Sequence, residues 1–220
     1  MELICFDMAG TTVNDQGAVL GAFRRTIGEL GVTGDRATWA ETYVLETMGQ
    51  SKIEVFGELF ADRAERANQA FERHFVDVVS EAGVSEVPGA RATIEELTQR
   101  GISVALTTGF SPATREVLID LLGWSELVPL RVSPADAGRG RPAPDMILNC
   151  ALRARVTSMS GIAVVGDTAS DMEAGRRAGV GECIGVLSGT DDAARLFDRG
   201  ADVVVESIAE LVSHSSFVAQ

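Results

Sequence analysis

Residues 2–12 read ELICFDMAGTT: an apolar run that leads into Asp7, followed by a glycine turn with two threonines. The run lacks the polar alternation of a half-exposed strand, which is typical of a short strand buried on both faces. From about residue 16 to residue 83 no strand is predicted. The periodicity there instead favours helices near 16–30, 36–47, 51–62 and 65–82. A buried first strand followed directly by an all-helical segment determines the expected architecture.

From Pro88 onward, strand-length apolar runs alternate with helical segments. Strands are predicted at 102–107, 128–132, 162–166, 182–187 and 202–205, and helices at 89–100, 112–122, 143–154, 170–178, 191–198 and 207–214. Such alternation predicts a parallel sheet with helices on both faces. We therefore predict an α/β protein, with a doubly wound parallel sheet in residues 1–14 and 88–220 and an inserted α-helical cap in residues 15–87. The turn formers of 14–17 and 84–89 mark the expected hinges.

The charge composition excludes two classes of partner. The 220 residues include 19 basic and 32 acidic side chains, a net charge of −13, so neither nucleic acid nor an anionic membrane surface is an expected partner. A small phosphorylated ligand remains compatible, because a local site can hold it. No apolar run is long enough to span a membrane, the N-terminus does not resemble a secretory signal, and the cysteines lack the spacing of a disulfide framework or a zinc site. We expect a cytoplasmic protein whose cysteines, Cys5, Cys150 and Cys183, are buried.

Four short motifs follow predicted strands or open predicted helices: DMAGTT at 7–12, TTG at 107–109, RGRPAPD at 139–145 and GDTASD at 166–171. In a doubly wound sheet, ligands bind outside the carboxyl ends of the strands, so these motifs should meet. A carboxylate on a glycine turn can attack phosphorus and form an acyl phosphate. Hydroxyl, guanidinium and backbone N–H groups can hold phosphoryl oxygens, and further carboxylates can bind Mg²⁺.

With these motifs the chain resembles the haloacid dehalogenase superfamily of phosphohydrolases along its whole length. The resemblance implies a Rossmann-like core, Asp7 as the nucleophile, and Arg141 as the basic residue of the third motif. It also implies a Mg²⁺ cofactor and phosphate contacts from Thr108, in preference to Thr107. The full sets it implies are Thr11, Thr108 and Gly109 for phosphate, and Asp7, Ala9, Asp167 and Asp171 for the metal.

Ala9 departs from the pattern of most phosphatases of the superfamily, which carry an aspartate there as general acid and base. Loss of that acid should slow departure of an alkoxide by about 10²–10⁴-fold. Either the protein is an impaired phosphatase, or its leaving group needs no proton from that side. A carbon–phosphorus bond meets the second condition, because it has no bridging oxygen to protonate.

The cap segment Met48-Gly-Gln-Ser-Lys52 contains the only lysine of the chain, beside 18 arginines. Taken with DMAGTT, TTGF, GRPAPDM and GDTASDM, it is similar to the phosphonatase (phosphonoacetaldehyde hydrolase) family, in which alanine replaces that aspartate. The resemblance implies that Lys52 forms an imine with a substrate aldehyde and that Met48 and Gly49 contact the substrate. Arginine cannot form such an imine, because its guanidinium stays protonated. Two other interpretations stay open: a lysine that only contacts substrate, and a solvated surface lysine.

Two positions depart from the phosphonatase pattern. Val55 stands in place of a histidine that transfers protons, and Phe110 in place of a tyrosine. The only histidines are His74, on a predicted cap helix, and His214. We expect His74 to lie on the helix surface rather than to replace the missing histidine. Phe71, Phe75 and Val79 recur at helical spacing and are expected in the cap core.

Three functions follow from the sequence. The first is phosphonatase-like cleavage of a small carbonyl phosphonate. The second is hydrolysis of a small O-phosphate monoester, and the third is phosphate binding with weak activity. The resemblance also implies a homodimer formed through the cap.

Overall fold

The computed structural model describes residues 1–217, and its centre is a six-stranded parallel sheet around β1 (Leu3–Asp7). The strand order is β5-β4-β1-β6-β7-β8. The other strands are β4 (Ser103–Thr107), β5 (Leu130–Val132), β6 (Ile162–Gly166), β7 (Glu182–Val186) and β8 (Val203–Val205). The switch point of this order lies at β1, so Asp7 ends its strand where a doubly wound sheet binds ligands.

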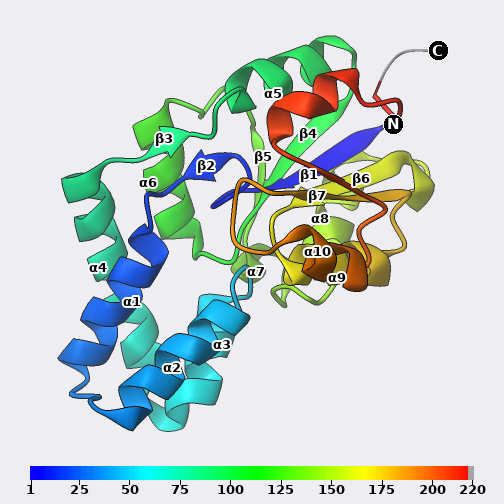
Figure 1. The fold of residues 1–220 in the computed structure, drawn as a ribbon. Helices are drawn as coiled ribbons and strands as arrows, with labels where there is room; N and C mark the ends of the chain where they lie inside the picture. The colour runs from blue at the N-terminus through cyan, green and yellow to red at the C-terminus, as the bar shows by residue number, and fades with distance from the viewer. Residues whose placement is uncertain (218–220) are drawn as a thin grey trace.

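Helices lie on both faces of the sheet (Figure 1). Alternate residues of β1 belong to apolar clusters on opposite faces. Leu3 and Cys5 belong to an apolar cluster with residues of α8 and α9, whereas Ile4 and Phe6 belong to a second cluster with residues of α5 and the C-terminal segment. The helices that follow the insertion are α5 (Ala90–Gln99), α6 (Pro112–Leu122), α7 (Pro134–Ala137), α8 (Asp145–Ala154), α9 (Ala169–Ala178) and α10 (Ala193–Asp198). The predicted doubly wound α/β fold is therefore confirmed.

Four helices are inserted between β1 and the rest of the sheet and lie to one side of it (Figure 1). They are α1 (Ala18–Glu29), α2 (Asp35–Glu46), α3 (Lys52–Phe60) and α4 (Ala64–Ala82). Their interior is a run of aromatic rings in which Phe56 lies between Phe23 and Phe71, at centroid distances of 6.1 and 5.6 Å. Phe71, Phe75 and Val79 of α4 are buried as predicted, because their spacing places them on one helix face. The exact boundaries of cap and core, at residues 14/15 and 87/88, stay a prediction.

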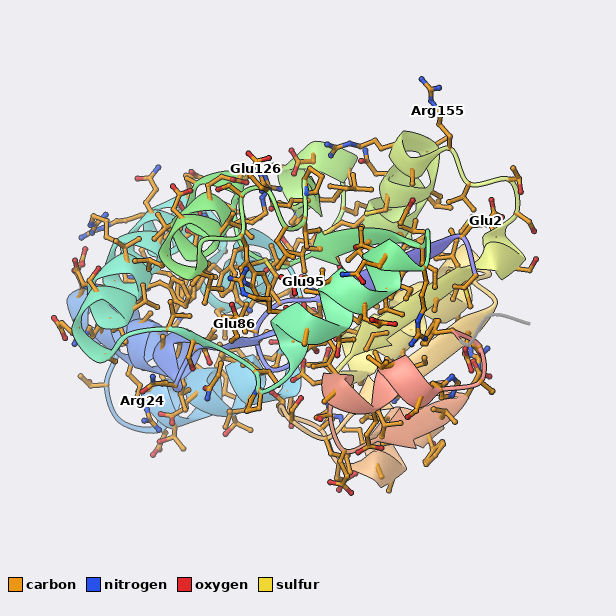
Figure 2. The ribbon with its side chains drawn as sticks, turned by 90° about the horizontal axis from the view of Figure 1, so that it is seen from above. Glu2, Arg24, Glu86, Glu95, Glu126 and Arg155 are labelled. Carbon is orange, nitrogen blue, oxygen red and sulfur yellow. The ribbon has the colours of Figure 1, made fainter. Side chains whose placement is uncertain are left out.

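The two connections between cap and core pair with each other, which the sequence did not predict. β2 (Val13–Asn14) runs antiparallel to β3 (Ser85–Glu86). Glu86, labelled in Figure 2, accepts hydrogen bonds from Arg91 Nε and Trp124 Nε1, both at 2.8 Å. The hinge is thus fastened to α5 and to the end of α6.

Several predicted boundaries differ from the structure. The strand predicted at 128–132 begins at Leu130, after Pro129, and the helix predicted at 143–154 begins at Asp145, after Pro144. Proline lacks the N–H that a strand ladder or a helix interior uses. The helix predicted at 207–214 is a 3₁₀ helix, η3 (Ile208–Ser213), and two shorter 3₁₀ turns are η1 (Ala61–Arg63) and η2 (Met159–Gly161).

The exterior is polar, and charged side chains such as Arg155 point away from the body (Figure 2). Cys5, Cys150 and Cys183 are buried free thiols, as expected. Within residues 1–217, every helix is too short or too polar to cross a lipid bilayer.

Candidate active site

Asp7 is held at the carboxyl end of β1 by a tight turn. The carbonyl of Met8 accepts hydrogen bonds from the backbone N–H groups of Thr12 and Val13, at 2.9 and 2.8 Å. The Thr12 hydroxyl donates to the Asp7 carbonyl at 2.8 Å. Gly10 adopts φ +93°, in the left-handed region that favours glycine. The sequence DMAGTT therefore fixes the Asp7 carboxylate just beyond the sheet, where it is 5% exposed.

Three buried carboxylates meet at this point. Asp7, Asp167 and Asp171 each offer an oxygen, and these atoms lie within 4.8 Å of one another. The Thr11 hydroxyl and the Thr190 N–H donate to Asp167, at 3.1 and 2.8 Å. Burial and the neighbouring charge of Asp7 raise the pKa of Asp167 to about 7. Buried carboxylates this close need a cation, and an all-oxygen donor set fits a hard divalent ion such as Mg²⁺.

Arg141 supplies positive charge to the same cluster. Its Nη2 lies 2.6 Å from Asp7 Oδ1, and its Nη1 pairs with Asp171. The side chain is only 3% exposed, and within residues 1–217 its Nε has no hydrogen-bond partner. Burial raises the pKa of Asp7 even though Arg141 opposes the shift. A guanidinium between two carboxylates, with a spare donor, is suited to hold phosphoryl oxygens.

The two threonines of the second motif, Thr107 and Thr108, have different surroundings. The Thr107 hydroxyl donates to the Phe6 carbonyl at 3.3 Å and so serves the sheet. Thr108 and Gly109 line the cavity that contains Asp7, and the Thr108 hydroxyl accepts from the Phe110 N–H at 3.3 Å. The geometry favours Thr108 over Thr107 as a phosphate contact.

The cap segment closes over these residues. The Lys52 N–H donates to the Gly109 carbonyl at 3.2 Å, and the Lys52 Nζ lies 5.9 Å from the centre of the Phe110 ring. A Cβ placed on Gly49 would lie 2.5 Å from the Thr168 hydroxyl, so cap and core approach too closely there for a side chain. The enclosed cavity measures about 30 Å³, which is the scale of water rather than of a substrate. Its lining residues are Asp7, Ala9, Val19, Met48, Gly49, Lys52, Thr108, Gly109, Phe110, Arg141, Thr168 and Thr190.

The environment of Lys52 makes its amine easier to deprotonate than that of an ordinary lysine. Burial and the charge of Arg141 lower the pKa of Lys52 to about 8, against the opposing effect of Asp7 and more distant carboxylates. The sequence contains cations that would lower this pKa and carboxylates that would raise it, so the direction of the shift could not be predicted from sequence. The structure brings Lys52 into one cavity with the predicted nucleophile and with Thr108.

Neither histidine reaches this cavity. His74 Nε2 lies 2.9 Å from Glu29 Oε2 between α4 and α1, and its side chain is 22% exposed. His214 is the C-cap residue of η3, and its ring lies beside that of Phe217. Val55, which stands where phosphonatases have histidine, is buried in the cap core. Residues 1–217 therefore place no imidazole around the cavity.

Two residues that contact the site, Thr190 and Asp191, follow β7 and lie outside the four sequence motifs. Thr190 binds Asp167 through its N–H, and Asp191 accepts the Ala169 N–H at 2.7 Å. A loop of small and acidic residues at the carboxyl end of a sheet strand is the signal that could have found them.

A family model of haloacid dehalogenase-like hydrolases matches residues 1–179. The chain belongs to this family. A phosphonoacetaldehyde hydrolase of Bacillus cereus (strain B4264) is 32% identical over 216 residues, covering 87% of this chain and 78% of that protein.

Two solved structures show the same fold as this haloacid dehalogenase-like hydrolase. A hydrolase from Pseudomonas syringae has a TM-score of 0.84 at 22% identity, covering 100% of both chains. A phosphonoacetaldehyde hydrolase-like protein from Oleispira antarctica has a TM-score of 0.81 at 24% identity, covering 96% of this chain and 89% of that chain.

Proposed function

We propose that this hydrolase cleaves the carbon–phosphorus bond of a small carbonyl phosphonate resembling phosphonoacetaldehyde. One observation carries the proposal: the only lysine of the chain lines the same closed cavity as Asp7, Thr108 and Arg141. The similarity to a Bacillus cereus phosphonoacetaldehyde hydrolase supports it.

In the proposed reaction the neutral amine of Lys52 condenses with the substrate aldehyde and releases water. The Asp7 carboxylate then attacks phosphorus, and the electrons of the breaking C–P bond move into the protonated imine to form an enamine. Water hydrolyses the aspartyl phosphate to phosphate. Protonation of the enamine at carbon and hydrolysis of the resulting imine release the aldehyde and restore Lys52.

The remaining residues hold the phosphoryl group. In the proposal Arg141, Thr108 and the backbone N–H of Gly109 donate to its oxygens. Thr11, in contrast, uses its N–H on the Met8 carbonyl and its hydroxyl on Asp167 in this structure. Bound Mg²⁺ would neutralise charge on the phosphoryl group, with Asp7, Asp167, Asp171 and the main-chain oxygen of Ala9 as its protein ligands. Ala9 then needs no acid function, because the departing carbon takes no proton from that position.

A second function, hydrolysis of a small O-phosphate monoester, is favoured by one observation. His74 is bound to Glu29, and Val55 and Phe110 carry no titratable group, so the cavity offers no imidazole or phenol for proton transfer to carbon. In that reaction Lys52 would be an electrostatic contact for the substrate.

Trapping of the imine separates the two functions. Incubation with phosphonoacetaldehyde and sodium borohydride should add one substrate-derived mass per chain, at Lys52 by peptide mapping. Lys52→Arg keeps the charge and should lose both the adduct and C–P cleavage. Asp7→Asn should still trap the imine but release no phosphate, because the near-isosteric amide leaves the fold intact and cannot serve as the nucleophile.

Three outcomes would contradict this function. Phosphate release from phosphonoacetaldehyde by Lys52→Arg at the parent rate would make the lysine a contact only. Turnover of an aryl phosphate without C–P cleavage would establish the O-phosphatase. Failure with both substrates in the presence of Mg²⁺ would leave a phosphate-binding protein.

We also propose a cytoplasmic location, which is consistent with the three free thiols.

We propose in addition a homodimer formed through the cap. Trp39 of α2 is 52% exposed and stacks on Tyr43 at a centroid distance of 5.9 Å, which leaves an aromatic surface on the cap. Sedimentation analysis of the whole chain, with a Trp39→Ala variant beside it, tests the dimer.

A further inference from the structure

The loop between β7 and α10 contacts two of the site motifs. The Ser188 hydroxyl donates to the Gly10 carbonyl at 2.7 Å, and the Asp191 N–H donates to the Asp167 carbonyl at 3.1 Å. The Asp191 carboxylate also accepts the Ala169 N–H at 2.7 Å. This loop therefore holds the backbone at Asp167 and at Ala169, and it also contacts the first motif at Gly10.

Arg195 of α10 extends from this loop to the cap. Its Nη2 donates to the Glu46 carbonyl at 3.2 Å, and its Nε lies 3.2 Å from Asp191 Oδ1. Glu46 is the last residue of α2, where helix carbonyls lack intrahelical partners and the helix dipole favours a cation. The Asp191 side chain is 8% exposed, so it is an ordered anchor for the guanidinium.

Arg195 crosses the boundary between cap and core at a groove. A groove of about 720 Å³ separates cap residues 46–50 from α9 and α10, and Arg195 lies along it. On the other side of the boundary the contact is apolar: the Phe110 ring lies 4.6 Å from that of Phe75. Packed rings, the hydrogen bond from the Lys52 N–H to the Gly109 carbonyl and the Arg195 guanidinium are thus separate contacts between cap and core.

We propose that Arg195 is a positioning residue that couples closure of the cap to the placement of Asp167. In the closed state one N–H of the guanidinium holds the end of α2, and another holds Asp191, which in turn holds the Asp167–Ala169 backbone. A lysine cannot replace it, because a single ammonium lacks the planar fork that reaches both partners. The inference rests on the proposed function only in that phosphoryl transfer takes place under the closed cap.

The amide of Lys52 provides a readout of closure that does not need activity. Lys52 is the first residue of α3, so its N–H has no helical acceptor and bonds to the Gly109 carbonyl across the boundary. The Val55 N–H, bonded to Ser51 within the cap, is an internal reference. Hydrogen exchange at Lys52 relative to Val55 therefore measures docking of the cap.

Arg195→Ala, Arg195→Lys and a control, Arg199→Ala, form the test. Arg199 lies on the same groove but pairs with Glu173 at 2.6 Å, within the core. Because the Arg195 side chain is 43% exposed, loss of its contacts should increase Lys52 exchange by roughly 3–10-fold. KM for an aryl phosphate should rise by about the same factor, with kcat changing less. The reason is that part of the substrate's binding free energy must then be used to close the cap. Arg195→Lys should recover less than half of each effect, and Arg199→Ala should match the parent.

Unchanged Lys52 exchange in Arg195→Ala, full recovery in Arg195→Lys, or an equal effect in Arg199→Ala would overturn the inference. If the parent protein shows no phosphoryl transfer, the proposed function fails, while the exchange comparison still decides whether Arg195 couples cap and core.

Discussion

Lys52 is an amine whose protonation state is set by burial more than by the carboxylates around it. A pKa of about 8 leaves about a tenth of the side chain neutral at pH 7, against about 0.03% for an unperturbed lysine. The proposed imine forms from the neutral amine, so in that reaction the position of this pKa would control how readily an aldehyde is captured.

Borohydride trapping at Lys52 should therefore depend on pH in a defined way. Between pH 6 and pH 8 the trapping rate should rise by roughly 50-fold, and above pH 8 it should level off, because the amine is then largely neutral. Initial rates of adduct formation, measured by intact mass with borohydride stability controlled at each pH, give the profile. A rate that still climbs tenfold per unit through pH 9 would mean an unperturbed lysine.

At this scale the motifs predicted which side chains meet, because strand ends of a parallel sheet converge on one edge. The loop that contains Thr190 could have been noticed from its position after a strand, but its contact with Asp167 could not, since a backbone N–H donor has no residue type that marks it. The pairing of His74 with Glu29 was equally out of reach, because it depends on how α1 packs against α4.

At the scale of elements, long periodic segments were predicted well and short ones were not. α4 and the strands around β1 follow from apolar spacing, since burial on one or both faces determines them. β2 and β3 comprise two residues each and have no periodicity to detect. Their pairing depends on the cap ends meeting, which only the folded chain brings about.

Gly109 of the core lies against the backbone of the cap segment at Gly49 and Gln50. This close approach gives a further prediction. A Cβ there would lie 2.9 Å from the Gln50 carbonyl carbon and 3.1 Å from the Gly49 carbonyl oxygen. Gly109→Ala should keep the cap from docking and lower kcat/KM by roughly 10–100-fold, since a misplacement of about 1 Å can cost about 100-fold. The melting temperature should hardly change. Gly57→Ala, on α3 with open space around it, is the matched control and should leave kcat/KM at the parent value. Full activity of Gly109→Ala would show that chemistry does not need this closed form.

For the whole molecule, we expect the clustered carboxylates to make stability depend on a divalent cation. Asp7, Asp167 and Asp171 are buried at mutual distances that disfavour three negative charges. Mg²⁺ at about 100 times its dissociation constant should stabilise the fold by about 2.7 kcal/mol and raise the melting temperature by several degrees. Asp167→Asn should melt at the parent's metal-free temperature or above it and should lose most of the response to Mg²⁺. Thermal melts in EDTA, Mg²⁺ and matched ionic strength check this, and an identical response in both proteins would place the ion elsewhere.

The antiparallel pairing of β2 with β3 brings both ends of the inserted helices to one point on the core, where Glu86 is bonded to Arg91 and Trp124. To the sheet, the whole insertion is therefore equivalent to a hairpin loop. The entropic cost of closing a loop grows slowly, by about 0.6 kcal/mol for each doubling of its length. Helical insertions of different size and shape can then be exchanged at Asn14 and Ser85 with little effect on the strands. In evolution, a new substrate could be acquired by replacing one cassette while the chemistry of Asp7 stays in place.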